Sequence, residues 1–381
     1  MNLKAKLICY VRSSEYRPDP RVRRLVSFLV KQESVPILLG LNRSGESPVG
    51  EDGGDFRIER FTFLKHHALP VDEVILGPFM VIWMFWVMTR LLRLRPDVIV
   101  ASDFDTMMPC IVASKTLGRP LIHDPHDFWA DDLGPPIPSF IIRSVRRMEQ
   151  LSTSFASGLI IADISRIAQY DRSRLPPRVV EIVNSPMKAS FLPGGKHRDL
   201  AEKGEMIVLY AGQLGTHGGI LELIGAVRAN SGIKLVLVGY GRIESEVSEA
   251  ISRRRNGVFL GRKSHEEVLS LTRDCDVVYA MYDPDVPNNR FASPNKLFEA
   301  MACGKPVLVN DNTRLADLVR AHNCGLVIPY GDEDSIRAAL SSLRDNKNLR
   351  TQLGANGLKA YEKYYNWNIM EDRLRRFFDE I

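Results

Sequence analysis

Short apolar runs alternate along this chain with longer segments of mixed polarity. The runs are apolar throughout rather than at every second position, which is typical of strands buried on both faces of a parallel sheet. A first series comprises residues 7–11, 35–39, 98–101, 121–123, 158–162 and 179–182. A second series comprises residues 207–211, 234–238, 258–260, 277–280, 306–309 and 325–327. Because helical segments separate these strands, each series predicts a doubly wound, Rossmann-like α/β domain.

A stretch rich in chain-breaking residues separates the two series. It runs over residues 184–198 and contains two prolines and a Gly-Gly pair, so we interpret it as a linker. The sequence thus predicts two domains, residues 1–190 and residues 191–365, that face each other across a ligand-binding cleft. Residues 366–381 form a separate last helix, because their apolar positions share one helical face.

Residues 74–89 carry no charge and are rich in Phe, Met and Trp. A membrane-spanning helix needs about 20 apolar residues, so this run is short for a span, and it lies between two strands of one predicted sheet. Two other interpretations are open. The helix is buried in the domain, or it also presents aromatic residues to a membrane surface beside Arg90, Arg93 and Arg95. The second interpretation predicts a peripheral membrane contact through residues 74–95.

The composition adds limits of its own. The chain has 381 residues, 25% charged and 45% apolar, which suits a globular protein that folds without disulfides. Its net charge is +5, and many of its arginines lie in short clusters. These clusters either belong to solvated helix faces or attract phosphates on a substrate or an anionic leaflet. No nucleic acid is expected as a partner. Five scattered cysteines and the lack of a signal-like start predict a cytoplasmic protein, peripheral on the inner membrane face if residues 74–95 bind lipid.

The strongest chemical signal lies in residues 290–308. A Ser-Pro-Asn turn at residues 293–295 opens a predicted helix over residues 295–303, and Gly304 ends it. The amino end of a helix offers unpaired backbone N–H groups and the positive end of the helix dipole, which suits a diphosphate.

Lys296 and Glu299 fall on one face of that helix. A cation in the first turn is unfavourable for the dipole, so Lys296 indicates a bound anion. A carboxylate at Glu299 can accept hydrogen bonds from two ribose hydroxyls, as the acidic residue does in dinucleotide sites. The alternative is an ordinary surface helix with an intrahelical Lys–Glu pair.

The sequence of residues 293–307, Ser-Pro-Asn-Lys-Leu-Phe-Glu-Ala-Met-Ala-Cys-Gly-Lys-Pro-Val, resembles the signature of family 4 retaining glycosyltransferases, whose fold is GT-B. Four other segments resemble family motifs. They are the Gly-rich loop at 210–214, the V-G-x-G turn at 237–241, the base-side loop at 259–262 and a "D-x-H-E/D" loop at 123–127. The helix that begins at Trp367 resembles the segment that crosses back in this family, so residues 366–381 are expected to pack on the N-terminal domain.

The resemblance implies a donor site in the C-terminal domain. Glu299 would bind the ribose, and Lys296 would hold the diphosphate together with backbone groups nearby. Those groups belong to Ser293, Pro294, Asn295 and Leu297. Gly212 would let the backbone approach the phosphates, with Gln213 beside it, and Gly261 and Arg262 would border the base.

The resemblance also implies roles in the N-terminal domain. His126 would reach the donor sugar from the opposite wall of the cleft, so His126 and Lys296 are the expected catalytic residues. A hydrogen-bonded structural histidine is the alternative for His126. Arg21, Arg23 and Asp124 are expected on the acceptor side, where the arginines would contact an acceptor phosphate.

Three positions depart from the family pattern. Phe291 replaces the first glutamate of the E-x7-E motif, which helps to hold the donor sugar. Gln213 replaces a basic residue of the Gly-rich loop, and residues 216–219 lack the lysine that commonly follows. Much of the positive charge at the diphosphate therefore falls on Lys296 and the helix end.

The resemblance implies a nucleotide-sugar donor, UDP-sugar favoured over GDP-sugar, and a glycan or lipid-linked acceptor in cell-surface polysaccharide or glycoconjugate synthesis. It implies retention of anomeric configuration, no cofactor and no metal. The triplet 103–105 is a D-x-D by its letters, and we interpret it as a strand-end loop that caps the next helix. A non-catalytic GT-B scaffold subunit and a nucleotide-sugar epimerase are the alternatives.

Overall fold

The computed structural model of the protein describes residues 1–16, 19–45, 47–63, 73–133, 137–187, 195–227 and 232–381. The chain divides into two compact units. Unit 1 comprises Met1–Ile182 and Glu371–Ile381, and unit 2 comprises Val183–Met370. Part of the expected linker, residues 188–194, lies outside the described residues.

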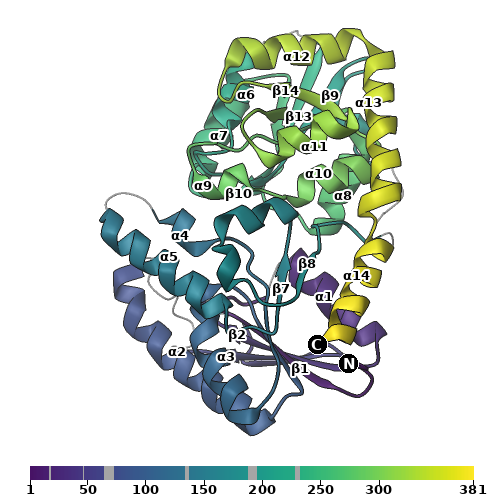
Figure 1. The fold of residues 1–381 in the computed structure, drawn as a ribbon. Helices are drawn as coiled ribbons and strands as arrows, with labels where there is room; N and C mark the ends of the chain where they lie inside the picture. Colours follow the sequence, from purple (N-terminus) through teal and green to yellow (C-terminus); the bar gives the residue numbers. More distant parts are fainter. Residues whose placement is uncertain (17–18, 46, 64–72, 134–136, 188–194, 228–231) are drawn as a thin grey trace. The chain divides into compact units, whose positions relative to one another are not determined.

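Unit 1 is built on an eight-stranded sheet in the order β3-β4-β2-β1-β5-β6-β7-β8 (Figure 1). Every neighbouring pair is parallel except β3 and β4. The strands are β1 (Leu7–Arg12), β2 (Val35–Leu41), β3 (Gly50–Asp52), β4 (Arg57–Phe61), β5 (Val98–Ala101), β6 (Leu121–His123), β7 (Gly158–Ile161) and β8 (Val179–Glu181). The strand order reverses between β1 and β5, which makes a topological switch point at their carboxyl ends.

The helices of unit 1 cover both faces of this sheet. They are α1 (Pro20–Lys31), α2 (Glu73–Leu94), α3 (Phe104–Leu117), α4 (Trp129–Asp132), α5 (Ser139–Thr153), two short 3-10 helices (Ile164–Gln169 and Arg172–Arg174) and the end of α14 (Trp367–Glu380). Strand register places the side chains of Cys9, Ile99, Leu121 and Leu159 on one face of the sheet. Helices α2 and α3 bury their apolar sides against that face, and α5 adds the partly buried Val145 to the neighbouring cluster.

The other face of the sheet in unit 1 is covered partly by α14. Phe28 of α1 stacks on Phe378 with their ring centroids 6.1 Å apart. A Cβ atom on Gly158 would lie 2.5 Å from the ring of Phe377, so glycine at this position lets the helix approach the strand closely. The last part of the closing helix, Glu371–Ile381, therefore packs on unit 1.

Unit 2 contains a six-stranded sheet, parallel throughout, in the order β11-β10-β9-β12-β13-β14. The strands are β9 (Met206–Gln213), β10 (Ile233–Tyr240), β11 (Gly257–Phe259), β12 (Val277–Tyr279), β13 (Val307–Asn310) and β14 (Gly325–Ile328). The switch point lies between β9 and β12, so the ends of these two strands form the natural place for a ligand.

Helices cover the sheet of unit 2 as well. They are α6 (Ile220–Ala226), α7 (Glu244–Ser252), α8 (His265–Asp274), α9 (Pro287–Arg290), α10 (Asn295–Ala302), α11 (Arg314–His322), α12 (Glu333–Asp345), α13 (Lys347–Ala360), a 3-10 helix (Arg198–Leu200) and a π-helical turn (Tyr361–Tyr365). The predicted α/β fold is confirmed in both units, and the twelve predicted strands are present within one or two residues.

Strands β3 and β4 were not predicted. Strand β4 reads Arg-Ile-Glu-Arg-Phe, and its buried charges are paired within the fold: Arg60 with Glu51, and Glu59 with Arg57 and Arg90. Buried ion pairs hide a strand from a search for apolar runs. Strand β3 is a short polar edge strand, and edge strands need no apolar run.

Candidate functional site

The amino end of α10 is the centre of the candidate site in unit 2. Pro294 occupies the N-cap position with extended backbone, and Gly304, at φ +64°, ends the helix one residue beyond its C-cap. The first-turn amides of such a helix have no partner in the preceding turn. The predicted helix is confirmed, and its open end can receive an anion.

Lys296, in the first turn of α10, is half-buried against two tyrosine rings. Its Nζ lies 4.2 Å from the ring centroid of Tyr210 and 5.0 Å from that of Tyr282. Among the described residues, no hydrogen bond or ion pair reaches the ammonium group. Burial lowers the pKa of Lys296 to about 8, although the nearby Glu299 opposes that shift. A half-buried cation held by aromatic faces alone is a group that an anion would stabilise.

Glu299 follows one turn later in α10 and is 3% exposed. Its Oε1 lies 3.6 Å from Nδ1 of His265, the first residue of α8. A capping box between Ser264 and Glu267 fixes the start of that helix. His265 was not predicted to belong to the site. No pattern in the sequence links it to Glu299, because the contact depends on how α8 and α10 pack.

The end of β9 brings Gly212 beside Lys296. A Cβ atom on Gly212 would lie 3.1 Å from the lysine Nζ, so a side chain here would crowd the ammonium group. Gln213, the last residue of β9, is exposed, and its backbone carbonyl accepts a hydrogen bond from the Tyr210 hydroxyl at 2.6 Å. The hydroxyl thus ties the strand end to the ring that faces Lys296.

The expected base-side residues lie after β11. Gly261 has φ +65° and open space around it. The exposed guanidinium of Arg262 stacks over the ring of Tyr240, 4.4 Å from its centroid. The half-exposed Tyr240 ring and the arginine form a flat pair of the kind that stacks with nucleobases.

Two asparagines hold the loops around Lys296, and neither was singled out in the sequence. Asn184 Nδ2 donates to the carbonyl of Ser293 at 2.8 Å, which fixes the turn before α10. Asn310, at the end of β13, accepts from the Tyr282 amide at 2.8 Å and donates to the Tyr282 carbonyl at 3.0 Å. The position of Asn310 at the end of a predicted strand can be recognised in the sequence. Its hydrogen-bond partner, the Tyr282 backbone, cannot.

A second polar cluster lies at the strand ends of unit 1. Both oxygens of the buried Asp124 have partners: Oδ1 accepts from Arg21, at 3.0 Å from Nε, and Oδ2 accepts from the Tyr10 hydroxyl at 2.8 Å. Arg21 also donates to the carbonyl of Ile182 at 3.1 Å. Two expected acceptor-side residues are thus paired with each other, whereas Arg23 is exposed on α1.

His126 lies beside this cluster. Its backbone N–H donates to Asp103 Oδ1 at 2.7 Å, and the guanidinium of Arg12 lies against its ring. Arg12 also pairs with Asp19 at 3.0 Å. Burial and the nearby arginines lower the pKa of His126 well below its usual value, so the ring is neutral at physiological pH.

Asp103 differs from its expected role. It occupies the N-cap position of α3, but its side chain makes no capping hydrogen bond. The carboxylate holds the amide of His126 instead, and its backbone has the unusual angles φ 65° and ψ 164°. Burial raises the pKa of Asp103 to about 7, and the nearby Arg12 opposes that shift.

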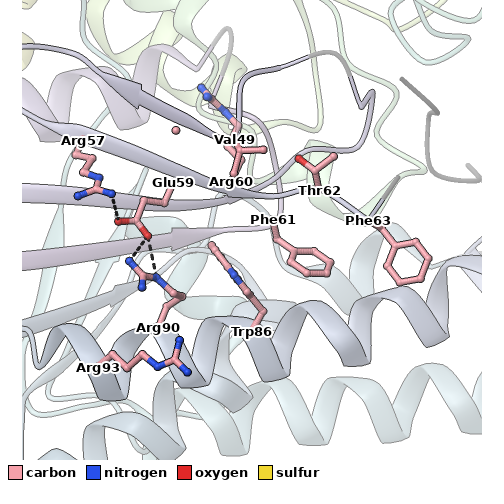
Figure 2. Close-up of a pocket in the computed structure, with 11 residues that line it drawn as sticks. Val49, Arg57, Glu59, Arg60, Phe61, Thr62, Phe63, Trp86, Arg90 and Arg93 are labelled. Atoms are coloured by element: carbon pink, nitrogen blue, oxygen red, sulfur yellow. Dashed lines mark hydrogen bonds and ion pairs between the residues drawn. The ribbon is translucent and has the colours of Figure 1, made fainter. Parts of the chain in front are cut away.

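Unit 1 also contains a pocket of about 650 Å³ between β4 and α2. Figure 2 shows Phe61 and Phe63 on the strand side of the pocket, and Trp86, Arg90 and Arg93 on α2. The arrangement joins aromatic surface to guanidinium groups. None of the residues that line this pocket was predicted to belong to the donor or acceptor site. Trp86, Arg90 and Arg93 fall within residues 74–95, the predicted membrane contact.

Two features of the described residues concern metal binding and membrane spanning. Within the described ranges, no group of three His, Cys, Asp or Glu side chains could hold a metal ion. No helix in the described part of the chain is long and apolar enough to cross a bilayer.

Family models match both halves of the chain. Residues 18–184 match the glycosyl transferase 4-like domain, and residues 196–360 match glycosyl transferases group 1. A phosphatidyl-myo-inositol mannosyltransferase of Mycobacterium leprae is 28% identical over 42% of this chain and 41% of that protein. An uncharacterized glycosyltransferase of Methanocaldococcus jannaschii is 26% identical over 45% of this chain and 48% of that protein. These alignments cover less than half of either relative.

One sequence relative and two solved structures are similar to this protein over most of its length. The N,N'-diacetylbacillosaminyl-diphospho-undecaprenol alpha-1,3-N-acetylgalactosaminyltransferase of Campylobacter jejuni is 24% identical over 84% of this chain and 86% of that protein. Sucrose-phosphate synthase of Thermosynechococcus elongatus has a TM-score of 0.77 at 17% identity, over 98% of each chain. HepE of Anabaena, solved with UDP and glucose, has a TM-score of 0.73 at 17% identity, over 99% of this chain and 100% of that chain. The chain therefore carries a glycosyl transferase 4-like domain followed by a group 1 glycosyl transferase domain, on a GT-B fold.

Proposed function

We propose that this protein is a glycosyltransferase that moves a sugar from a nucleotide-diphosphate sugar to a glycan or lipid-linked acceptor. The main support is the environment of Lys296. Its ammonium group is half-buried at the open end of α10 and has no ion pair among the described residues. Glu299, one turn further along the same helix, supplies the carboxylate for the ribose. Both family matches support transferase chemistry.

The expected chemistry needs few groups. Charge builds on the diphosphate as the glycosidic bond to it breaks, and the reacting sugar becomes oxocarbenium-like. Lys296 and the first-turn amides of α10 would stabilise that charge. The lysine would thereby replace the basic residues that are absent at Gln213 and at residues 216–219.

His126 is proposed to contact the donor sugar as a neutral hydrogen-bonding group. The position supports this role, because the residue follows a parallel strand near the switch point of unit 1. Arg23 is proposed to contact an acceptor phosphate. Arg21, which is paired with Asp124, is proposed to shape the acceptor side by holding that carboxylate in place.

The finer features of the reaction are also proposals. We favour UDP over GDP as the nucleotide, retention of anomeric configuration, a reaction without metal or cofactor, and a role in cell-surface polysaccharide or glycoconjugate synthesis. HepE was solved with UDP, whereas a Corynebacterium glutamicum relative is described as GDP-mannose-dependent. GDP is therefore the main competing outcome for the nucleotide.

Calorimetric titration of the full chain with UDP, GDP, ADP and dTDP tests the donor site. We expect one nucleotide to bind and Glu299→Ala to weaken that binding by about tenfold to a hundredfold, since two hydrogen bonds to a charged group are lost. Glu249→Ala is the matched control, because Glu249 is an exposed carboxylate on α7 of the same unit and pairs with Arg253 rather than with a residue of α10.

The other outcomes separate the alternatives. A folded protein that binds none of the four nucleotides would favour the non-catalytic scaffold, which Phe291 and Gln213 make conceivable. Conversion of a nucleotide sugar without any acceptor would favour the epimerase. If transfer occurs, NMR of the product decides the stereochemistry, and an inverted anomeric centre would refute the proposed retention.

A further inference from the structure

Large apolar side chains are exposed together on three helices of unit 1. Helices α2, α3 and α5 lie side by side in the layer that covers one face of the sheet (Figure 1). Their solvent sides carry apolar groups that are between 42% and 63% exposed. These are Ile82 and Phe85 on α2, Met108 and Val112 on α3, and Phe140 and Met148 on α5. We call this surface the apolar band.

Large exposed apolar patches commonly mark an interaction surface. The inward side of α2 is already used, since Trp83, Val87 and Leu91 are buried against the sheet. The outward side therefore contributes nothing to the core, and exposing it to water is a cost that a partner would remove.

The charges on the band have one sign. Among the described side chains of α2, α3 and α5, every exposed charged residue is basic: Arg93, Lys115, Arg143 and Arg147. The acidic side chains of α3 and α5 are turned inward. Glu149 accepts hydrogen bonds from the amides of Trp129 and Ala130, at 2.8 and 3.0 Å. Such a surface complements a partner that is apolar inside and negatively charged at its boundary.

The pocket under α2 adjoins the band. Glu59 is shared by two arginines, with Arg57 at 3.2 Å and Arg90 at 2.8 Å, so this triad keeps a net positive charge (Figure 2). Arg93 adds a guanidinium with no partner among the described residues. Trp86 and Phe61, with ring centroids 5.7 Å apart, both line the pocket. Aromatic rings beside guanidinium groups suit the boundary between lipid tails and phosphates.

We propose that the apolar band of α2, α3 and α5 docks on an anionic lipid bilayer, with the pocket between β4 and α2 receiving the phosphate of one lipid. The apolar side chains enter the boundary between headgroups and acyl chains, and the arginines pair with lipid phosphates. The predicted contact through residues 74–95 is thereby extended to α3 and α5. The proposal does not depend on the sugar-transfer chemistry of unit 2.

Vesicle flotation with the full chain tests the proposal. Vesicles of phosphatidylcholine alone are compared with vesicles of equimolar phosphatidylcholine and phosphatidylglycerol. We expect binding to the anionic vesicles, and release as salt is raised, because salt screens the attraction. The double variant Arg93→Glu, Arg147→Glu should weaken binding by about fivefold or more for each arginine lost. The double variant Phe85→Ser, Phe140→Ser should weaken it at all salt concentrations.

The control variant is Arg253→Glu with Arg255→Glu, which reverses two exposed charges on unit 2 and should leave flotation unchanged. Equal thermal unfolding midpoints show that the variants are folded. The proposal is overturned if the wild-type protein fails to float with anionic vesicles at low salt, or if the control weakens binding as much as the band variants. It is also overturned if sedimentation shows a dimer without lipid that the Phe85→Ser, Phe140→Ser variant dissociates, since a second copy would then cover the band.

Discussion

At the residue scale, Lys296 is a half-buried cation that contacts two tyrosine rings. Its ammonium group faces Tyr210, Tyr282 and the backbone at Gly212, and burial lowers its pKa to about 8. A bound diphosphate would favour the charged form and raise that pKa. The proposed nucleotide binding would therefore be coupled to the protonation of Lys296.

This coupling predicts a pH dependence. Nucleotide affinity should be constant below about pH 7 and should fall above about pH 8, by up to about tenfold per pH unit, because the free protein loses the lysine proton there. Calorimetry in two buffers of different ionisation enthalpy measures the affinity and the proton uptake together. Lys296→Met should bind more weakly, with no fall across this range. A flat profile for the wild-type protein would show that Lys296 does not contact the diphosphate.

Asp103 is the second residue whose environment has a measurable consequence. Its backbone adopts a conformation that side chains rarely take, and its carboxylate holds the amide of His126. Such strain costs about 1–3 kcal/mol and persists where the surroundings fix it. Asp103 is thus a positioning residue for the loop that carries His126.

Burial raises the pKa of Asp103 from an ordinary value near 4 to about 7, so the folded state binds its proton more tightly than the unfolded state. The stability from that proton is present below about pH 4 and is lost as the pH rises to about 7. Asp103→Asn keeps the acceptor for His126 without the charge. Its free energy of unfolding should rise relative to wild type by about 1 kcal/mol per pH unit between pH 4 and 7.

Urea unfolding followed by tryptophan fluorescence measures this difference. Three of the four tryptophans, Trp83, Trp86 and Trp129, belong to unit 1, so the signal reports mainly on the unit that contains Asp103. Asp103→Ala should be destabilised at every pH, because it leaves the His126 amide without its partner. A pH-independent difference between wild type and Asp103→Asn would mean that the carboxylate is ionised throughout.

At the scale of elements, the ends of β9 and β10 approach each other more closely than side chains allow. A Cβ atom on Gly239 would lie 1.9 Å from the carbonyl oxygen of Gly212, and one on Gly241 would lie 2.4 Å from that of Leu214. The V-G-x-G turn is therefore a packing requirement that brings Gly212 to its place beside Lys296.

Gly239→Ala should destabilise unit 2 by about 3 kcal/mol or more, because the added methyl group meets backbone that cannot move aside without breaking the sheet. Thermal unfolding measures the loss, and nucleotide titration of the folded fraction reports on Gly212. Gly215→Ala is the matched control, since its Cβ atom would meet nothing within 4 Å. Equal unfolding midpoints for the two variants would contradict this account.

Elements also show what the sequence could and could not predict. Buried strands and α10 were predictable because apolar runs, Pro294 and Gly304 are local signals. Strand β4 was missed because its charges are neutralised by Arg90 and Glu51, and neither partner is visible from the strand itself. Local pattern identifies an element, whereas the pairing of its charges depends on the tertiary fold.

At the scale of the whole molecule, the GT-B fold followed from two series of strands and from family motifs. The roles of Lys296, Glu299 and His126 stay predictions. Their supports, among them His265, Asn310 and Asp103, were not predictable, because each acts through a residue far away in the sequence.

The helix α14 makes unit 1 discontinuous in the sequence. Glu371–Ile381 contribute the Phe378 stack, the Lys31–Glu371 ion pair at 2.5 Å and the Arg373–Glu181 ion pair at 2.8 Å, yet they follow all of unit 2. A ribosome that adds about 5–20 residues per second would need roughly 10–40 s to pass from Ile182 to Glu371. During that interval the apolar surface of α1 and β7 that α14 later covers stays exposed. Unit 2 can therefore finish folding first, although unit 1 is the first to be synthesised.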